Sequence, residues 1–257
     1  NDLNIGGSNN TIASTNVGNY TIVGGTGNNI ASPSYGNASI FGCKNGTITR
    51  GSDGTAMLGS INNTLTNTNN WSSVMLGGSG NTLNGGGKRR FMLGGEDNTM
   101  GGGNDSFSGI IGGENNTLTG HERSVIIGGD TLSTTKSDEV VVPNLTTNGA
   151  VVQNVEALTI ATNVAEIDAS LGNLFTLTLQ NGVNTELQLT NQSAGQTFQV
   201  QITNNATGAG TISFDSQFEF EGGTAFTATA TTSAVDILTF TCFGGGNVQC
   251  VSAKNFS

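Results

Sequence analysis

The chain has 257 residues, of which 40 are glycine and only 10% are charged, and its formal net charge is −10 at pH 7. This acidic balance argues against binding to nucleic acid or to an anionic membrane surface. No apolar run is long enough to cross a bilayer, so we expect no membrane insertion. The length allows one or two domains. The chain begins at Asn1 without a secretory signal, so we expect part of a longer chain or a processed one.

A repeated stretch dominates the first half of the chain. It reads apolar-apolar-Gly-Gly-x-x-Asn-Thr-apolar, as in residues 92–100 and 110–118. Copies follow one another at spacings of 16 to 18 residues, with their first glycines at Gly6, Gly24, Gly42, Gly59, Gly77, Gly94, Gly112 and Gly128. This short, regular period leaves no room for two helices and predicts stacked coils that each contribute two short strands.

Two kinds of residue define the corners of each coil. The glycine pair allows a sharp turn with positive φ. An asparagine recurs four residues after the first glycine, at Asn10, Asn28, Asn63, Asn81, Asn98 and Asn116, and Gly46 stands in its place in the third copy. We expect these side-chain amides to form a ladder along the stack that satisfies the backbone groups of the corners.

The two positions before the first glycine of each copy are apolar, except for Asn4 in the first copy. Neighbouring residues of a strand face opposite sides, so one row should fill the coil while the other points outward. An apolar stripe on the order of several hundred Å² would then need a covering chain, most simply in a homotrimer. A flattened coil with both rows inside is the alternative and would leave a monomer. One row, expected in the core or the trimer interface, is Ile22, Ile40, Met57, Met75, Met92, Ile110 and Ile126. The row beside it is Ile5, Val23, Phe41, Leu58, Leu76, Leu93, Ile111 and Ile127.

Three loops between copies contain unusual residues. Trp71 is the only tryptophan, Lys88, Arg89 and Arg90 form the densest basic run, and His121 is the only histidine. Each could be a solvated corner. The alternative is a side-wall contact to a glycan or a neighbouring protein, since Trp and Arg dominate binding hot spots. The basic run could instead pair with an acidic surface of an adjacent chain.

The period breaks after residue 130. Residues 131–150 are polar and then extended, so we expect a neck between a repeat domain at 1–130 and a second domain at 151–257. In the second domain apolar and polar residues alternate with period two, as in 175–179 and 198–202. The expected fold is therefore all-β, with a parallel β-roll or solenoid of about eight coils followed by an antiparallel β-sandwich or jelly-roll knob.

The chemistry-bearing residues are sparse. His121 has no nucleophile nearby in sequence, and the His and Cys residues are too scattered for a zinc site. Cys242 and Cys250 flank a glycine-rich turn, and they either pair across it or are small core residues; with Cys43 they make an odd count, which favours free thiols. Paired carboxylates could cleave glycans, but those available more simply line a wet strand face. They are Asp215, Glu219, Glu221 and Asp236. We expect no enzyme, cofactor or metal site.

Several segments resemble a known class of proteins. Residues 123–129 (Arg-Ser-Val-Ile-Ile-Gly-Gly) and 72–78 resemble the head repeats of trimeric autotransporter adhesins and their Gly/Asn-rich relatives in phage and large-virus fibre proteins. Residues 142–145 resemble the neck that follows such rolls, and 195–210 with 235–238 resemble a C-terminal module of phage tail fibres. The resemblance implies three parallel β-rolls side by side. The repeat here is slightly longer than the usual adhesin repeat, so the coil shape is not carried over.

These observations favour a structural virion protein. It would be a trimeric tail or capsid fibre on the virion exterior that binds a host receptor or glycan and contacts other virion proteins. A bacterial or cellular surface adhesin is the alternative. An ice-binding solenoid is a further candidate, based on Thr-x-Thr at 47–49, 64–66 and 117–119, although Asn84 and Gly101 interrupt that row.

Overall fold

The computed structural model describes residues 2–14, 18–32, 36–49, 54–67, 72–103 and 105–256. The chain forms two compact units, Asn1–Thr146 and Thr147–Ser257, which are taken in turn below. Strands make up nearly all of the regular structure, and the one helical element among the described residues is a short 3-10 turn at Glu221–Gly223. The all-β prediction is confirmed. None of the described segments forms a helix with the length and apolar character needed to cross a membrane.

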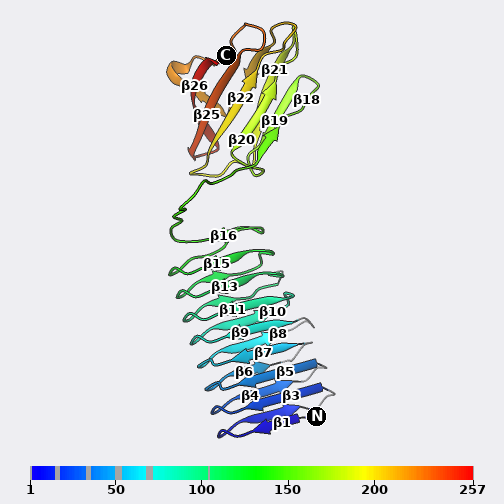
Figure 1. The fold of residues 1–257 in the computed structure, drawn as a ribbon, viewed down its shortest axis with the longest axis vertical. Coiled ribbons are helices and arrows are strands. Elements are labelled where there is room, and N and C mark those ends of the chain that lie inside the picture. Colours follow the sequence, from blue (N-terminus) through cyan, green and yellow to red (C-terminus); the bar gives the residue numbers. More distant parts are fainter. Residues whose placement is uncertain are drawn as a thin grey trace. The chain divides into compact units, whose positions relative to one another are not determined.

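The first unit is a parallel β-solenoid, in which each of the first seven coils gives one strand to each of two sheets (Figure 1). Sheet I contains, in spatial order, β1 (Asp2–Ile5), β3 (Gly18–Val23), β5 (Gly36–Phe41), β7 (Thr55–Leu58), β9 (Ser73–Leu76), β11 (Arg90–Leu93), β13 (Gly109–Ile111), β15 (Val125–Ile127) and β16 (Val140–Val141). Sheet II contains β2 (Thr11–Ser14), β4 (Asn29–Ser32), β6 (Thr47–Thr49), β8 (Thr64–Asn67), β10 (Thr82–Gly85), β12 (Thr99–Met100) and β14 (Thr117–Leu118). The parallel solenoid predicted from the repeat is confirmed.

The register joins equivalent positions of successive repeats. Met57 pairs with Met75, and Met75 pairs with Met92. A third line of single parallel bridges runs along the glycine corners and joins Ser8, Thr26, Lys44, Ile61, Ser79, Glu96, Glu114 and Asp130. Because β16 still pairs with β15, the stack continues to Val141, beyond the boundary at residue 130 expected from the loss of the repeat.

The solenoid core is a column of apolar side chains. The row predicted for the core or the trimer interface has 0% exposure within a single chain, so all seven residues belong to the interior and none is available to a partner. Sheet II supplies the facing side of the column with Ile30, Ile48, Leu65, Leu83, Met100 and Leu118, also 0% exposed. One coil cannot bury this face alone, which is why the strands are stable only when stacked.

The predicted amide ladder is present at the corners. The Oδ1 of Asn63 accepts the backbone N–H of Asn81 at 2.8 Å, and the Oδ1 of Asn81 accepts that of Asn98 at 2.9 Å. Asn98 Nδ2 also donates to the carbonyl of Gly113 at 3.0 Å, in the same following coil whose Asn116 N–H is accepted by Asn98 Oδ1. Four asparagines of the ladder are 0% exposed, so their polar atoms depend on these partners: Asn63, Asn81, Asn98 and Asn116. Each amide therefore ties two coils together through both its donor and its acceptor.

The third repeat departs from this pattern in a compensated way. Gly46 replaces the asparagine and cannot continue the ladder, although its own N–H donates to Asn28 Oδ1 at 2.9 Å. Cys43 takes the place of the second glycine, where in other coils, as at Gly25, an added Cβ would collide with the asparagine amide. The thiol fills the vacated volume, and Ser60 Oγ donates to Cys43 Sγ at 3.2 Å. A thiol–hydroxyl contact thus replaces one step of the amide ladder.

The second unit contains two sheets that share one apolar core. The six-stranded sheet has the order β17 (Val155–Ala157), β20 (Leu174–Thr178), β22 (Thr197–Thr203), β25 (Val235–Gly244), β26 (Asn247–Phe256) and β24 (Phe218–Phe220). The four-stranded sheet has the order β18 (Ile160–Ala161), β19 (Val164–Asp168), β21 (Asn184–Thr190) and β23 (Thr211–Phe214). Edge-to-face rings such as Phe175 on Phe198, with centroids 6.0 Å apart, lie in the core.

The predicted antiparallel pairing is wrong for most of this unit. Five of its eight strand pairings are parallel. From β19 to β23 successive strands alternate between the two sheets, so neighbours within a sheet come from successive turns of the chain and point the same way. Period-two alternation reports which face of a strand is buried, and it carries no information on the direction of its neighbour. Antiparallel pairing is confined to β18–β19, β22–β25 and β25–β26.

We expect Asn81→Ala to lower the free energy of unfolding by about 2–4 kcal/mol, because it leaves buried polar groups of two neighbouring coils without partners. Asn84→Ala is the matched control, since Asn84 is half-buried on the outward face of β10; it should change stability by about 0.5 kcal/mol or less. Chemical denaturation monitored by circular dichroism measures both. Equal losses in the two variants would show that the amide ladder contributes nothing specific.

Candidate functional site

The most extensive exposed apolar feature of the first unit lies on the outward face of sheet I. We call it the outer apolar row: Ile5, Val23, Phe41, Leu58, Leu76, Leu93, Ile111 and Ile127. Phe41, Leu76 and Ile127 are 40%, 39% and 42% exposed, while Val23 and Leu93 are half-buried. The prediction that the two adjacent rows face opposite sides is confirmed, and the flattened coil with both rows inside is wrong.

The row is continuous because the strands that carry it are paired in register. Leu58 lies beside Leu76, which lies beside Leu93, so each side chain is one strand spacing of about 4.8 Å from the next. The seven steps between the eight residues give a stripe roughly 34 Å long. Scattered single apolar residues are normal on a soluble protein, but a contiguous stripe of this kind marks an interaction surface.

A shallow groove of about 690 Å³ follows the glycine corners beside this row. It is lined by Ile61, the corner glycines and three exposed carboxylates, Glu96, Glu114 and Asp130, which we call the acidic ladder. These three residues bridge one another in parallel register, so like charges stand on adjacent coils. Like charges placed directly opposite on neighbouring strands repel, and a cationic partner would relieve that repulsion.

The basic run divides into two exposed residues and one buried residue. Lys88 and Arg89 are exposed just before β11, at the opposite end of that strand from Glu96. The guanidinium of Arg89 lies 5.3 Å from the ring centroid of Phe107, a cation–π distance. Lys88 and Arg89 therefore remain candidates for a side-wall contact at the level of β11.

The prediction that Arg90 belongs to a surface contact is wrong. Its side chain and that of Asp105 are both 0% exposed, with Nη1 3.0 Å from the Asp105 carboxylate. Nη2 also donates to the carbonyl of Gly85 at 3.2 Å, whereas Nε lacks a hydrogen-bond partner. Strand alternation explains the position, because Arg90 precedes the buried Met92 by two residues and so points into the coil. The two-residue spacing between Arg90 and Met92 can be read from the sequence, and it identifies Arg90 as an interior residue.

The other two predicted contact residues do not join this region. Trp71 lies outside the described residues. His121 is half-buried before β15, two coils above β11, and its Nδ1 is 2.7 Å from Thr134 Oγ1. Next to it, Arg123 pairs with Asp138 on the surface through Nε and Oδ1 at 2.6 Å, and the guanidinium lowers the pKa of Asp138.

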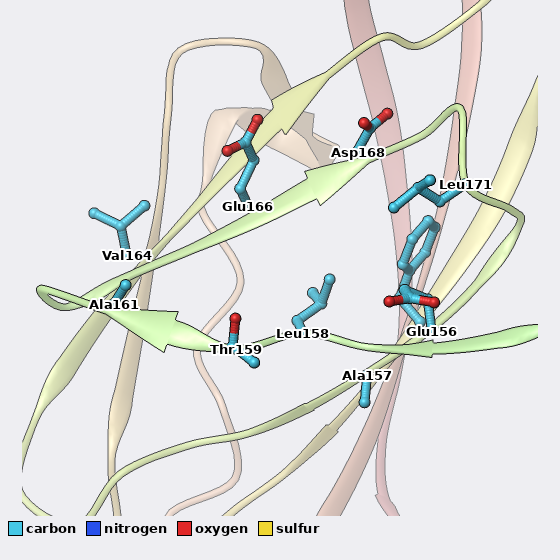
Figure 2. Close-up of a pocket in the computed structure, with 10 residues that line it drawn as sticks. Glu156, Ala157, Leu158, Thr159, Ala161, Val164, Glu166, Asp168 and Leu171 are labelled. Carbon is cyan, nitrogen blue, oxygen red and sulfur yellow. The ribbon is translucent and has the colours of Figure 1, made fainter.

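The second unit has a pocket of about 390 Å³ beside β17, β18 and β19 (Figure 2). Glu156, Glu166 and Asp168 contribute carboxylates, and Leu158 and Phe175 are among its apolar lining. Asp168 Oδ1 accepts hydrogen bonds from Ser170 and Asn191, which lowers the pKa of Asp168. Thr190 Oγ1 donates to Glu166 at 2.9 Å. Across the described ranges no group of three or more His, Cys, Asp or Glu side chains is arranged to hold a metal ion.

The remaining carboxylates singled out in the sequence have structural partners. The two oxygens of Glu219 accept from Asn247 and Gln249, and these bonds lower the pKa of this exposed carboxyl. Asp236 is buried and accepts from Thr229 and from the backbone N–H of Asn255. Asp215 accepts the N–H groups of Leu189 and Gln217, while Glu221 is exposed in the 3-10 turn.

The cysteines are free and buried. The disulfide considered for Cys242 and Cys250 is therefore wrong, and the free-thiol expectation is confirmed. Burial raises the pKa of the Cys250 thiol to about 12, so it stays protonated at neutral pH. All three thiols are buried, which makes these cysteines core residues.

Threonines form a row on the outward face of sheet II. They are Thr11, Thr47, Thr64, Thr82, Thr99 and Thr117, paired in register with Asn29 in the second coil. In the row beside them, the paired positions hold threonine in β6 and β8, at Thr49 and Thr66, and Ala13, Ala31 and Asn84 elsewhere, while Thr119 follows the end of β14. Ice binding by this face stays a prediction.

No family model, curated protein or solved structure matches the chain.

We expect Asp105→Ala to destabilise the solenoid by about 3–5 kcal/mol, since it leaves the guanidinium of Arg90 buried without its counter-charge. The double variant Arg90→Met with Asp105→Ala should recover most of that loss. Asp138→Ala is the matched control, because the pair with Arg123 is exposed and should be worth about 1 kcal/mol or less. Denaturation midpoints decide the matter: a double variant no more stable than Asp105→Ala contradicts the role of the buried pair.

Proposed function

We propose that this chain is a structural protein of a homotrimeric fibre on the exterior of a virion, where it serves attachment to a host surface. The solenoid would be the shaft, and the second unit a β-sandwich knob that contacts a receptor or glycan. The single observation that carries the proposal is the outer apolar row, because it needs a partner as long and as regular as the solenoid itself. The resemblance of residues 72–78 and 123–129 to trimeric fibre repeats supports the same reading.

The most economical partner is another copy of the chain. The row repeats at one strand spacing along the whole stack, so a covering surface must present apolar side chains at the same interval. A second solenoid in parallel orientation does this automatically, and a closed ring of such chains leaves no row uncovered. Each 100 Å² of apolar surface that is covered contributes about 2.5 kcal/mol before the cost of association.

We expect Leu76→Glu with Leu93→Glu to convert the assembly into monomers, because charges would be buried in the centre of the proposed interface. Thr82→Glu with Thr99→Glu is the matched control, since it places two glutamates on the same two coils but on the outward face of sheet II. The control should keep the mass of three chains. Sedimentation equilibrium or native mass spectrometry gives the mass, and a wild-type chain that stays monomeric at micromolar concentration overturns the trimer.

The location is tested separately from the mass. An antibody against residues 147–257 should decorate the outside of intact virions from the source that encodes the chain, as seen by immunogold electron microscopy. Antibody against an internal virion protein is the control and should bind only opened particles. Labelling of a cell envelope, with none on particles, would place the chain among surface adhesins instead.

A further inference from the structure

Opposite charges border the outward face of sheet I at the two ends of its strands. We call the side where the strands begin and the side where they end the two edges of this face. Lys88 and Arg89 are exposed where the chain enters β11, and Glu96 is exposed at the glycine corner where the chain leaves the same strand. One coil further, Glu114 continues the acidic ladder, and Asp130 follows on the next. The outer apolar row runs between these two edges. The face therefore has a basic side, an apolar centre and an acidic side at one level of the stack.

We infer that copies of this chain pack side by side in the same orientation, with Lys88 and Arg89 of one chain against Glu96 and Glu114 of the next. The inference rests on the proposed trimer and adds which edges meet. The contact is head to tail: every chain offers its basic edge to one neighbour and its acidic edge to the other. A ring closed in this way uses each edge once per chain.

The levels of the charged residues support parallel packing. In a ring whose axis runs along the stack, every chain keeps its coils at the same height, so residues of one coil meet the same coil of the neighbour. Lys88, Arg89 and Glu96 all belong to the coil of β11. Two stacks that run in opposite directions about a two-fold axis, with their eight coils fully overlapping, would instead bring the third coil of one chain against the sixth coil of the other. The only described basic residue on the corner line is Lys44, which would face Glu96 of the other chain in that arrangement.

The acidic ladder needs counter-charge from outside its own chain. No described basic side chain forms an ion pair with Glu96, Glu114 or Asp130. The neutral side-chain amide of Asn115 donates to Glu114 Oε1 at 3.5 Å. Parallel register holds the three carboxylates on adjacent coils, so their mutual repulsion persists until cations approach. The basic edge of an identical chain supplies those cations at the level of Glu96, one coil from Glu114.

Charge reversal tests the edge assignment on the full chain. Lys88→Glu with Arg89→Glu, and separately Glu96→Lys with Glu114→Lys, should each raise the concentration for half-dissociation of the trimer at least tenfold at low salt. The quadruple variant restores opposite charges across the edge and should return to within about threefold of wild type. High salt should shrink both effects, because exposed charges are screened. Circular dichroism of each variant checks that the solenoid is folded.

Lys44→Glu is the control, because in parallel packing Lys44 stands three coils from Glu96 along the corner line; it should dissociate like wild type. Three results overturn the edge assignment while leaving the trimer intact: reversal of either edge without effect, absence of rescue in the quadruple variant, or rescue of Glu96→Lys by Lys44→Glu. The last result would establish opposed stacks. A wild-type monomer would instead reject the proposed fibre itself, so the two failures are distinguishable.

Discussion

The first unit depends on hydrogen bonds that are made between coils and not within them. A coil of this length has too few residues to close its own backbone bonds at the glycine corners, and the asparagine side chains at those corners are buried. The asparagine amides resolve the problem because one side chain offers both a donor and an acceptor. In Asn98, for example, Nδ2 donates to the carbonyl of Gly113 at 3.0 Å and Oδ1 accepts the backbone N–H of Asn116 at 2.9 Å. Stacking is thus imposed by polar satisfaction as much as by the apolar column inside.

The same constraint explains why the outer apolar row exists as a continuous feature. Once the corners fix the register, equivalent positions of every repeat fall on one line, and any residue type selected at that position becomes a stripe. Interior rows and outward rows are therefore equally regular. The chemistry of each line, whether apolar, acidic or threonine-rich, then decides what the corresponding face of the solenoid can contact.

Features that follow from local periodicity could be read from the sequence. The interior row, the glycine corners and the amide ladder each depend on residues a few positions apart, and the structure has them. The interior position of Arg90 also follows from its two-residue spacing from Met92. A basic run nevertheless suggests a solvated loop, and the interior position is tolerable only because Asp105 is buried beside Arg90 as its counter-charge. The parallel path of β19 to β23 was not accessible, because strand direction is set by the route of the chain between sheets, which alternation does not record. The pairing of β16 with β15 was missed because Val140–Val141 lacks the glycine signature of the repeat.

The substitution of Gly46 for asparagine gives the solenoid a joint. On either side of the third coil, carboxamides link neighbouring turns, whereas there a thiol and a hydroxyl do so through a weaker contact. A rod assembled from strong and weak links yields at the weak one, so bending or tension along the axis would concentrate at Cys43 and Ser60. The amino-terminal turns could then peel away as a block while the longer carboxy-terminal segment keeps its shape.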